Sequence, residues 1–424
     1  MPTADVVVIG AGLAGLSCGV ELAERGAHVF VAAKGMAATH WTHGGIDVAA
    51  PRGARTPRAG VTQLARILGH PYTLLADDVE AALARHLGLL AAAGLPYVGD
   101  LDARLTPIPT AIGTMRPAAI LPEAQSAALA QWAPDEGLLL VGFERFRDAW
   151  PGFAASMLRR AGGPPGEVRA VEARLPGLDE LHNLNAAVVA RLFDDPAWRR
   201  PALAAIRDVV PAGRWRIGLP AVLGLADHAA VIGEAQAVLG HRVVEIPGLP
   251  PSVPGLRIFE ALRARLLAAG GRFQFGFPVA EVERVGRRVI AVHTEGASRT
   301  LRLAASEYVL ATGGIGGAGI RALPDGRLEE RVFGLPVDAP PAGAWFADDP
   351  LAPQPIDPAG IRVDAELRPV GGGIGNVRVI GSAMAGMRYL DERCGDGVAI
   401  ASAHRAARLL SGERPGSVKA EAVA

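Results

Sequence analysis

The chain has 424 residues, half of them apolar, and its 43 basic residues balance its 43 acidic residues. This composition excludes a disordered chain, and the length allows two or three domains of about 150 residues each. The zero net charge gives no electrostatic reason to expect nucleic acid as a partner. Cys18 and Cys394 are too few for a disulfide framework, a zinc site or an iron–sulfur site. We therefore expect no metal, and any redox chemistry requires a bound organic cofactor.

The N-terminal segment predicts a strand, a turn, a helix and a second strand. Residues 5–9 and 28–32 are apolar runs, and residues 13–24 show helical spacing. Between the first strand and the helix, residues 10–15 read Gly-Ala-Gly-Leu-Ala-Gly. In such a motif the first glycine permits a tight turn, the second lets a diphosphate approach the backbone, and the third lets the helix pack on its strand. The sequence thus predicts a dinucleotide site at the N-terminus of this helix.

The middle of the chain, residues 71–250, is rich in Leu and Ala and predicts an inserted α/β unit. Its expected helices cover residues 76–93, 143–160, 178–192 and 228–239. Its expected strands cover residues 138–141, 166–171, 215–219 and 242–246. A cluster of prolines, which do not fit inside a helix or a central strand, closes the unit. These are Pro247, Pro250, Pro251 and Pro254.

The remaining part predicts the return of the chain to the first sheet. Its expected elements are a helix over 256–269, an apolar stretch over 273–279, a β-meander over 282–294 and 300–303, a strand over 307–310, a loop over 335–358, a strand over 377–380 and a helix over 397–410. We predict an α/β fold with a Rossmann-like dinucleotide-binding domain and an inserted α/β cap domain. The expected division is 1–70 and 251–424 for the dinucleotide-binding domain and 71–250 for the cap, which would also bind substrate.

The end of the second strand departs from the NAD pattern. An acidic residue normally follows the glycine motif by about 20 residues and holds the ribose hydroxyls. Here the strand ends at Lys34 and Gly35, so the sequence favours a flavin over NAD. Lys34 would pair with phosphate or be a solvated strand end. Glycines also follow two later strands, at 313–314 and 381, and open the last helix at 395–397. Together they suggest a ligand that crosses one sheet from its first strand to its last helix.

Several of these segments resemble the flavoproteins grouped with fumarate reductase and L-aspartate oxidase. The segments that carry this resemblance are residues 32–35, 44–47, 311–314 and 395–397. Within that group the chain is most similar to the B subunit of anaerobic glycerol-3-phosphate dehydrogenase, and the similarity runs nearly end to end. The segments specific to that subunit are residues 70–75, 113–116, 185–192, 219–225, 249–257 and 394–398.

The resemblance implies that the Rossmann-like domain is an FAD-binding domain of the GR2 flavoprotein type. It also implies a flavin subunit that oxidises sn-glycerol 3-phosphate to dihydroxyacetone phosphate. It implies two partners, a catalytic flavoprotein subunit and an iron–sulfur membrane anchor, with electrons passing to a quinone in fumarate or nitrate respiration. The longest uncharged run, residues 6–20, is shorter than the roughly 20 residues of a membrane span. We therefore expect a cytoplasmic protein, without direct membrane insertion, held at the inner face of the membrane by a partner.

Three alternatives stay open. The flavin of this family's subunit is commonly described as FMN, but only FAD has a diphosphate for the glycine turn, so we favour FAD. The chain would be a non-catalytic electron-transfer or assembly subunit if its flavin only relays electrons. A stand-alone enzyme for another small hydroxy acid is the third alternative.

The candidate site residues follow from these motifs and the resemblance. The expected cofactor-binding residues are Gly10, Ala11, Gly12, Leu13, Ala14, Gly15, Lys34, Gly35, Gly44, Gly45, Val279, Thr312, Gly313, Gly381, Gly395, Asp396, Gly397 and Val398. His40 and His43 are candidates for the catalytic base or a ring contact, with loop packing as the alternative. Arg116 and Arg257 are candidates for binding the substrate phosphate, with a solvated surface charge as the alternative. Tyr72 is expected to be a packing aromatic.

Overall fold

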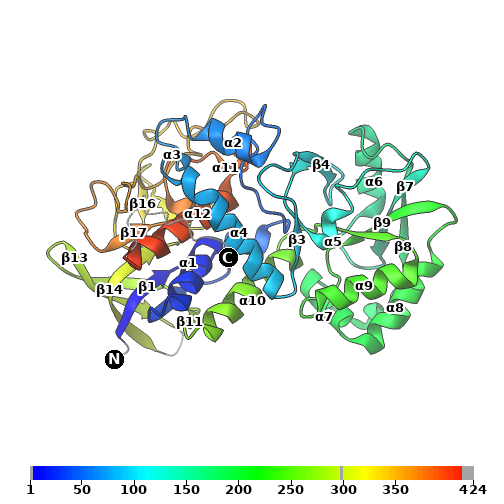
Figure 1. The fold of residues 1–424 in the computed structure, drawn as a ribbon, viewed down its shortest axis with the longest axis horizontal. Helices are drawn as coiled ribbons and strands as arrows, with labels where there is room; N and C mark the ends of the chain where they lie inside the picture. Colours follow the sequence, from blue (N-terminus) through cyan, green and yellow to red (C-terminus); the bar gives the residue numbers. More distant parts are fainter. Residues whose placement is uncertain (1–2, 297–298, 413–424) are drawn as a thin grey trace, which may run out of the picture.

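The computed structural model describes residues 3–296 and 299–412. They form two main sheets with separate hydrophobic cores and three two-stranded sheets (Figure 1). The larger sheet contains β1 at its centre, between β2 and β14. β1 is buried from Val6 to Ile9, as expected for a parallel strand covered on both faces. The strand order is β11-β2-β1-β14-β13-β12, with β17 also paired to β14. The strands are β1 (Thr3–Ile9), β2 (Val29–Ala33), β11 (Arg272–Phe275), β12 (Val279–Val285), β13 (Arg288–Glu295), β14 (Thr300–Leu310) and β17 (Val377–Val379).

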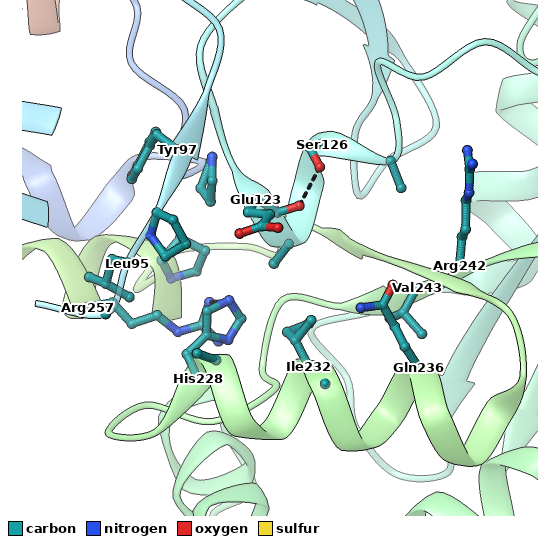
Figure 2. Close-up of a pocket in the computed structure, with 18 of the residues that line it drawn as sticks. Leu95, Tyr97, Glu123, Ser126, His228, Ile232, Gln236, Arg242, Val243 and Arg257 are labelled. Carbon is teal, nitrogen blue, oxygen red and sulfur yellow. Dashed lines mark hydrogen bonds between the residues drawn. The ribbon is translucent and has the colours of Figure 1, made fainter. Parts of the chain in front are cut away.

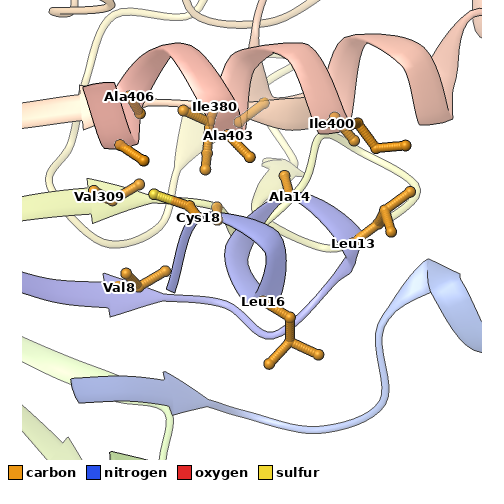
Figure 3. Packing of buried hydrophobic residues seen from close by; sticks show 14 of the residues in the cluster. Val8, Leu13, Ala14, Leu16, Cys18, Val309, Ile380, Ile400, Ala403 and Ala406 are labelled. Atoms are coloured by element: carbon orange, nitrogen blue, oxygen red, sulfur yellow. The ribbon is translucent and has the colours of Figure 1, made fainter. Parts of the chain in front are cut away.

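Five of these strands are parallel, namely β11, β2, β1, β14 and β17, whereas β13 and β12 continue from β14 as an antiparallel meander. Helices α1 (Leu13–Glu24) and α12 (Gly395–Leu410) pack against each other, and α1 also contacts α10 (Val253–Ala268). Ala14 and Cys18 of α1 face Ala403 and Ala406 of α12, and these small side chains let the two helices approach closely (Figure 3). Burial raises the pKa of the Cys18 thiol above its ordinary value, so Cys18 acts as a packing residue.

The smaller sheet is entirely parallel, in the order β10-β9-β7-β8. Its strands are β7 (Glu136–Phe143), β8 (Val168–Ala173), β9 (Arg214–Pro220) and β10 (Arg242–Ile246). Its helices are α6 (Pro151–Arg160), α7 (Ala186–Asp194), α8 (Pro196–Asp208) and α9 (His228–Leu239). The remaining elements of the described chain are η1 (Ala38–Trp41), α2 (Pro57–Leu64), α3 (Tyr72–Leu75), η2 (Ala76–Asp78), α4 (Val79–Ala92), β3 (Tyr97–Val98), β4 (Thr106–Pro109), β5 (Met115–Ala118), β6 (Leu121–Pro122), α5 (Glu123–Ser126), η3 (Leu178–Glu180), β15 (Ile320–Ala322), β16 (Leu328–Glu330), η4 (Gly381–Ala383) and α11 (Tyr389–Glu392).

The sequence predicted α1, α9 and β10 with their observed bounds, but other elements differ. The expected helix over 143–160 begins only at Pro151, because Phe143 ends β7. The expected helix over 178–192 is a short η3 followed by α7, whose N-terminus is capped by the side chain of Asn185. The expected strand at 307–310 is the end of the long strand β14. α8 was not predicted.

The helix expected over 256–269 begins earlier, at Val253, so the prediction that Pro254 lies outside a helix was wrong. Pro254 occupies the first turn, where a backbone N–H has no intrahelical acceptor to lose. The Ser252 hydroxyl caps this turn by accepting a hydrogen bond from the N–H of Gly255 at 3.0 Å.

The segment after residue 70 belongs to the larger core. Tyr72, Leu75, Val79 and Leu90 are buried in it, and α4 contacts α10 and α12. The division at residues 70 and 250 stays a prediction, but this packing favours a first boundary beyond Ala92. Among the described residues, no helix has both the length and the apolar character needed to cross a membrane.

Candidate functional site

A cavity of about 870 Å³ lies at the carboxyl ends of β1, β2 and β14. In the sheet, β1 lies between β2, the next strand in the chain, and β14, which comes much later in the chain. The strand order therefore changes direction at β1, and ligands of open α/β sheets bind at such a switch point. The sequence-predicted residues that line the cavity are Gly10, Ala11, Gly12, Leu13, Ala14, Lys34, Gly35, Val279, Thr312, Gly313, Gly381, Gly395 and Asp396. The structure therefore gathers most of the expected cofactor-binding residues around one space.

Three glycines of the N-terminal turn have three different roles. Gly10 has φ +111°, and a Cβ there would lie 2.3 Å from the carbonyl oxygen of Ala311 on the neighbouring chain segment. A Cβ on Gly15 would lie 2.0 Å from the carbonyl oxygen of Gly10, so this glycine lets α1 pack on the turn. Gly12 meets no backbone atom, since its nearest neighbour would be the Ala37 Cβ at 3.4 Å. Gly12 thus leaves the cavity open beside the start of α1.

The N-terminus of α1 is suited to an anion. Gly12 is its N-cap residue, and no side chain caps the first turn. The free N–H groups and the helix dipole of an uncapped N-terminus attract phosphate groups. Lys34 lies in the same cavity wall, after β2, and adds a positive charge.

Two buried polar atoms in the cavity wall lack a partner among the described residues, namely Thr312 Oγ1 and Trp345 Nε1. Buried polar groups are normally hydrogen-bonded, so both atoms fit contacts to a bound polar ligand. The sequence singled out Thr312 but missed Trp345, which lies in the Pro-rich loop that it treated only as a connection.

The other predicted cofactor-binding residues lie outside the cavity wall. A Cβ on Gly44 would lie 2.6 Å from the Pro254 Cβ, and a Cβ on Gly45 would lie 2.5 Å from His43 Nε2. A Cβ on Gly397 would lie 2.2 Å from the Tyr72 hydroxyl oxygen. These glycines permit close packing, as Gly15 does. Val398 is fully buried in the large core.

Tyr72 has the packing role that the sequence predicted. It is fully buried, and its hydroxyl donates to the carbonyl oxygen of Val48 at 2.5 Å.

The two candidate histidines do not present a free nitrogen to the cavity. His40, in η1, is buried, and its ring packs on Phe259 with 4.8 Å between centroids. Its Nδ1 lies 3.2 Å from the carbonyl oxygen of Ala37, and burial lowers its pKa. Arg116 Nη1 donates to His43 Nδ1 at 2.8 Å, so the neutral His43 ring carries its proton on Nε2. Burial is the main cause that lowers the pKa of His43 to about 4.

Arg116 contacts His43 and Asp47, and Asp47 in turn contacts Asp396. Its Nη2 forms an ion pair with Asp47, and the backbone N–H of Asp47 donates to Asp396 Oδ2 at 3.0 Å. Burial, and secondly the charge of Asp47, raise the pKa of Asp396 to about 7. Because Asp396 also lines the cavity, it links the cavity to the His43, Arg116 and Asp47 group.

A second arginine, Arg393, lies near this group. Burial and secondly the charge of Arg116 lower the pKa of Arg393, while Asp47 opposes them. Arg116 is ion-paired with Asp47, and Arg393 lies within the electrostatic influence of both residues. Two guanidinium groups near one carboxylate suit a phosphate group. The sequence did not reveal Arg393, because one arginine among 41 gives no signal. Asp47 lay in the 44–47 segment but was assigned no role.

The guanidinium group of Arg257 is already hydrogen-bonded to other residues of this chain. A second cavity, of about 460 Å³, lies between α5, α9 and α10, and Figure 2 shows Arg257 beside His228 at its wall. Arg257 donates from Nη1 and Nη2 to the two oxygens of the buried Glu245, at 2.7 and 3.0 Å, and from Nε to the carbonyl oxygen of Gly224 at 2.8 Å. All three nitrogens are committed, so Arg257 stabilises the contact of α10 with the smaller sheet and is unsuited to bind phosphate.

Comparison with known proteins identifies the family. Residues 5–398 match the model of the FAD binding domain. The chain is 32% identical over 417 residues to the B subunit of anaerobic glycerol-3-phosphate dehydrogenase from Yersinia pseudotuberculosis, covering 94% of this chain and 96% of the relative. It is 33% identical over 429 residues to the protein of the same name from Pectobacterium atrosepticum, covering 97% and 99%. The probable B subunit from Halobacterium salinarum is 33% identical over 423 residues, with 95% and 96% covered.

The chain belongs to the family of anaerobic glycerol-3-phosphate dehydrogenase B subunits. This membership confirms the predicted family, the predicted FAD-binding α/β fold class and FAD as the flavin. The cavity fits that cofactor, because an uncapped helix N-terminus, Lys34 and two orphaned polar atoms line it.

Solved structures are more distant. The chain is 12% identical to 3-ketosteroid Δ1-dehydrogenase from Sterolibacterium denitrificans, with a TM-score of 0.48 and coverage of 97% and 100%. It is 10% identical to FrdA of the E. coli quinol fumarate reductase, with a TM-score of 0.44 and coverage of 97% and 70%. Both scores are low, so neither likeness supports a functional argument.

Proposed function

We propose that this B-subunit family member oxidises sn-glycerol 3-phosphate to dihydroxyacetone phosphate within a glycerol-3-phosphate dehydrogenase complex. The observation that carries the proposal is the position of Asp396. It lines the expected FAD cavity and also contacts Asp47, which pairs with Arg116. A phosphate-binding pair of arginines therefore lies beside a cavity suited to a redox cofactor.

The residues of the cavity wall would hold FAD at this edge of the sheet. The backbone of the 10–14 turn and Lys34 would bind the diphosphate, and the hydroxyl of Thr312 would donate to or accept from a polar group of the cofactor. When bound, FAD supplies the acceptor for the hydride that leaves the secondary alcohol carbon.

The chain's own groups would orient the substrate and take its proton. Arg116 and Arg393 would bind the phosphate, and Asp47 would keep Arg116 in place. Asp396 has a pKa of about 7, which suits a general base at neutral pH, and one of its oxygens is not used by the Asp47 N–H. We infer that this oxygen takes the hydroxyl proton, a role that the sequence assigned to His40 or His43.

The relatives are named as one lettered subunit of an enzyme, and this name supports an assembly with partner subunits. We propose that these are a second flavoprotein subunit and an iron–sulfur anchor. Electrons would pass through them to a quinone, and the anchor would hold this chain at the inner face of the membrane.

A second candidate function is supported by the two histidines. Neither His40 nor His43 offers a free nitrogen to the cavity, as a histidine base would. On this alternative, the flavin of this chain relays electrons from a partner that oxidises the substrate, and the Asp396 group only holds the cofactor.

One experiment on the purified chain separates the two candidates. The FAD-loaded chain is mixed anaerobically with glycerol 3-phosphate, and the flavin absorbance is followed. Bleaching supports oxidation by this chain, whereas an unresponsive flavin refutes it and favours the relay function. Acid release and mass measurement of the flavin test the cofactor, since FMN alone would overturn the use of the glycine turn.

A further inference from the structure

Three side chains outside the cavity form a buried cluster next to Arg393. His70 Nε2 lies 3.2 Å from Glu392 Oε2, and the Cys394 thiol lies 3.5 Å from the same oxygen and 3.9 Å from His70 Nε2. All three residues are buried. Glu392 Oε2 also accepts the backbone N–H of Arg388 at 2.7 Å. One carboxylate oxygen thus gathers donors from residues 70, 388 and 394.

The composition of this cluster is that of a metal site, but its hydrogen bonds oppose one. The backbone N–H of Tyr72 donates to His70 Nδ1 at 3.0 Å, so the neutral ring carries its proton on Nε2. A metal on Nε2 would leave both ring nitrogens as acceptors, which requires an imidazolate. Burial and the nearby Glu392 raise the pKa of the Cys394 thiol well above its ordinary value, so the metal-binding thiolate is also disfavoured.

The cluster instead explains the backbone at Arg393. This residue follows α11 with φ 47° and ψ 55°, the left-handed region that side-chain-bearing residues seldom adopt. Such a conformation costs about 1 to 3 kcal/mol and persists where neighbouring contacts hold it. Here the residues on both sides of Arg393, Glu392 and Cys394, are buried and joined to each other and to His70.

We propose that His70 is a positioning residue that acts through Glu392 to hold Arg393 beside Arg116 and Asp47 for anion binding. This inference rests on the proposed role of Arg393 as a phosphate-binding residue. The Nε2–H of His70 fixes the Glu392 carboxylate, and Glu392 fixes the turn of residues 388–394 through the Arg388 N–H. Burial alone would raise the pKa of Glu392, but the hydrogen bonds from His70 and from the Arg388 N–H outweigh it and keep this pKa below its ordinary value, as needed for a charged acceptor.

The variants are chosen to change the two hydrogen bonds of the His70 ring, one to Glu392 and one from the Tyr72 N–H. His70→Phe keeps a ring but removes both the Nε2–H donor and the Nδ1 acceptor. His70→Gln offers an amide N–H to Glu392 and serves as the conservative rescue. Glu392→Gln keeps the side-chain size and its accepting oxygen but removes the charge, and it provides a second test if His70→Phe does not retain FAD.

The test uses inorganic phosphate as the probe and the absorbance of the FAD-loaded chain as the signal, at fixed ionic strength. Losing a hydrogen bond to a charged group predicts a Kd for phosphate about tenfold weaker in His70→Phe. His70→Gln should stay within about threefold of wild type, and Glu392→Gln should be weakened by about threefold or more. FAD content and the unfolding midpoint show which variants are folded.

A double-mutant cycle separates positioning from a general structural role. If His70 acts through Arg393, then His70→Phe should cost little further phosphate affinity in an Arg393→Gln background. An additive loss in that background, or a folded His70→Phe chain with unchanged Kd, overturns the proposal. Absence of phosphate binding to wild type overturns it as well. If the flavin does not respond to glycerol 3-phosphate but the double-mutant cycle still shows that His70 and Arg393 act together in phosphate binding, only oxidation by this chain is refuted.

Discussion

Replacing Gly12 with Asp should weaken FAD binding strongly without destabilising the protein. Gly12 is the N-cap residue of α1 in extended backbone, with φ −76° and ψ −175°. Asp is a preferred N-cap residue and exceeds Gly there by a few tenths of a kcal/mol. The new Cβ would meet only the Ala37 Cβ, at 3.4 Å, so the fold has room for it. The apoprotein of the variant should therefore unfold at the same temperature as wild type or slightly above.

The cost to FAD comes from the carboxylate. It would occupy the helix N-terminus in place of the diphosphate and repel it. Two like charges about 4 Å apart interact by about 1 kcal/mol in water and about 4 kcal/mol at an effective dielectric of about 20. Gly12 is partly exposed, so we expect a loss of about 2 to 4 kcal/mol, or about thirty- to a thousandfold in Kd.

The assay is FAD titration of the apoprotein, followed by quenching of flavin fluorescence, with a thermal melt of the apoprotein beside it. Gly152→Asp is the matched control, because it also adds an acid to the first turn of a helix, α6, and a Cβ there meets nothing within 4 Å. If Gly12→Asp binds FAD as tightly as wild type, the diphosphate does not lie at this turn. A large fall in the melting temperature would show that the N-cap argument is wrong.

Four further predictions concern the charged group and the packing of Gly397. Arg116→Gln should raise the KM for glycerol 3-phosphate by about tenfold or more in steady-state kinetics, because a hydrogen bond to a charged group is lost. The control is Arg362→Gln, which replaces an exposed arginine outside the site and should leave KM unchanged. Flavin reduction should accelerate as pH rises through about 7, and Asp396→Asn should remove that dependence in stopped-flow measurements; a persisting step would exclude Asp396 as the base. Because the folded-state pKa of Asp396 is raised above its ordinary value, its ionisation also lowers stability as pH rises from about 4 to 7, and the Asn variant should lose less stability over this range in denaturant titrations. Gly397→Ala should destabilise the fold by about 1 to 3 kcal/mol through overlap with the Tyr72 hydroxyl, and an unchanged urea midpoint would contradict this packing role.

The sequence predicted best what is determined locally. The β1 strand, the glycine turn and α1 occupy 22 consecutive residues. The motif predicted that its glycines permit close approach, although Gly10 approaches the distant Ala311 and Gly12 has Ala37 as its nearest neighbour. Local features also account for α9, which has helical spacing and the C-cap glycine Gly240.

The start of α6 and the whole of α8 were missed. Phe143 continues the buried strand β7, and Pro151 in the first turn of α6 and the capping Asp195 of α8 are local start signals that were not used. Pro201 lies inside α8, where a proline locally disfavours a helix, so this helix depends on tertiary packing.

The sequence singled out Arg116 and Asp396 as separate candidates. It did not predict that they would be joined by Asp47 and Arg393, because the members of this charged group come from distant segments. Asp47, Arg116 and Arg393 meet only when the loop after β2, strand β5 and the turn before α12 are packed together. Arg257 is the opposite case, a residue that the sequence proposed for phosphate binding and that the structure makes unsuitable. It follows the proline cluster and resembled a phosphate ligand, but Glu245 neutralises it in the interior. An arginine's role is set by whether a carboxylate is already placed to receive it, and spacing does not reveal that.

The balance of charge is what makes the Asp396 group suitable for an anion. Asp47 pairs with Arg116 and is also near Arg393, so one negative charge faces two positive charges. Asp396 would supply the second negative charge, but burial and the charge of Asp47 hold its pKa near 7, so it is only partly ionised at neutral pH. A phosphate group arriving at the arginines would supply the missing negative charge. The same arrival would further favour the protonated form of Asp396, since like charges repel. Substrate binding and the proton affinity of the proposed base are therefore coupled through Asp47, a residue whose importance no sequence motif signals.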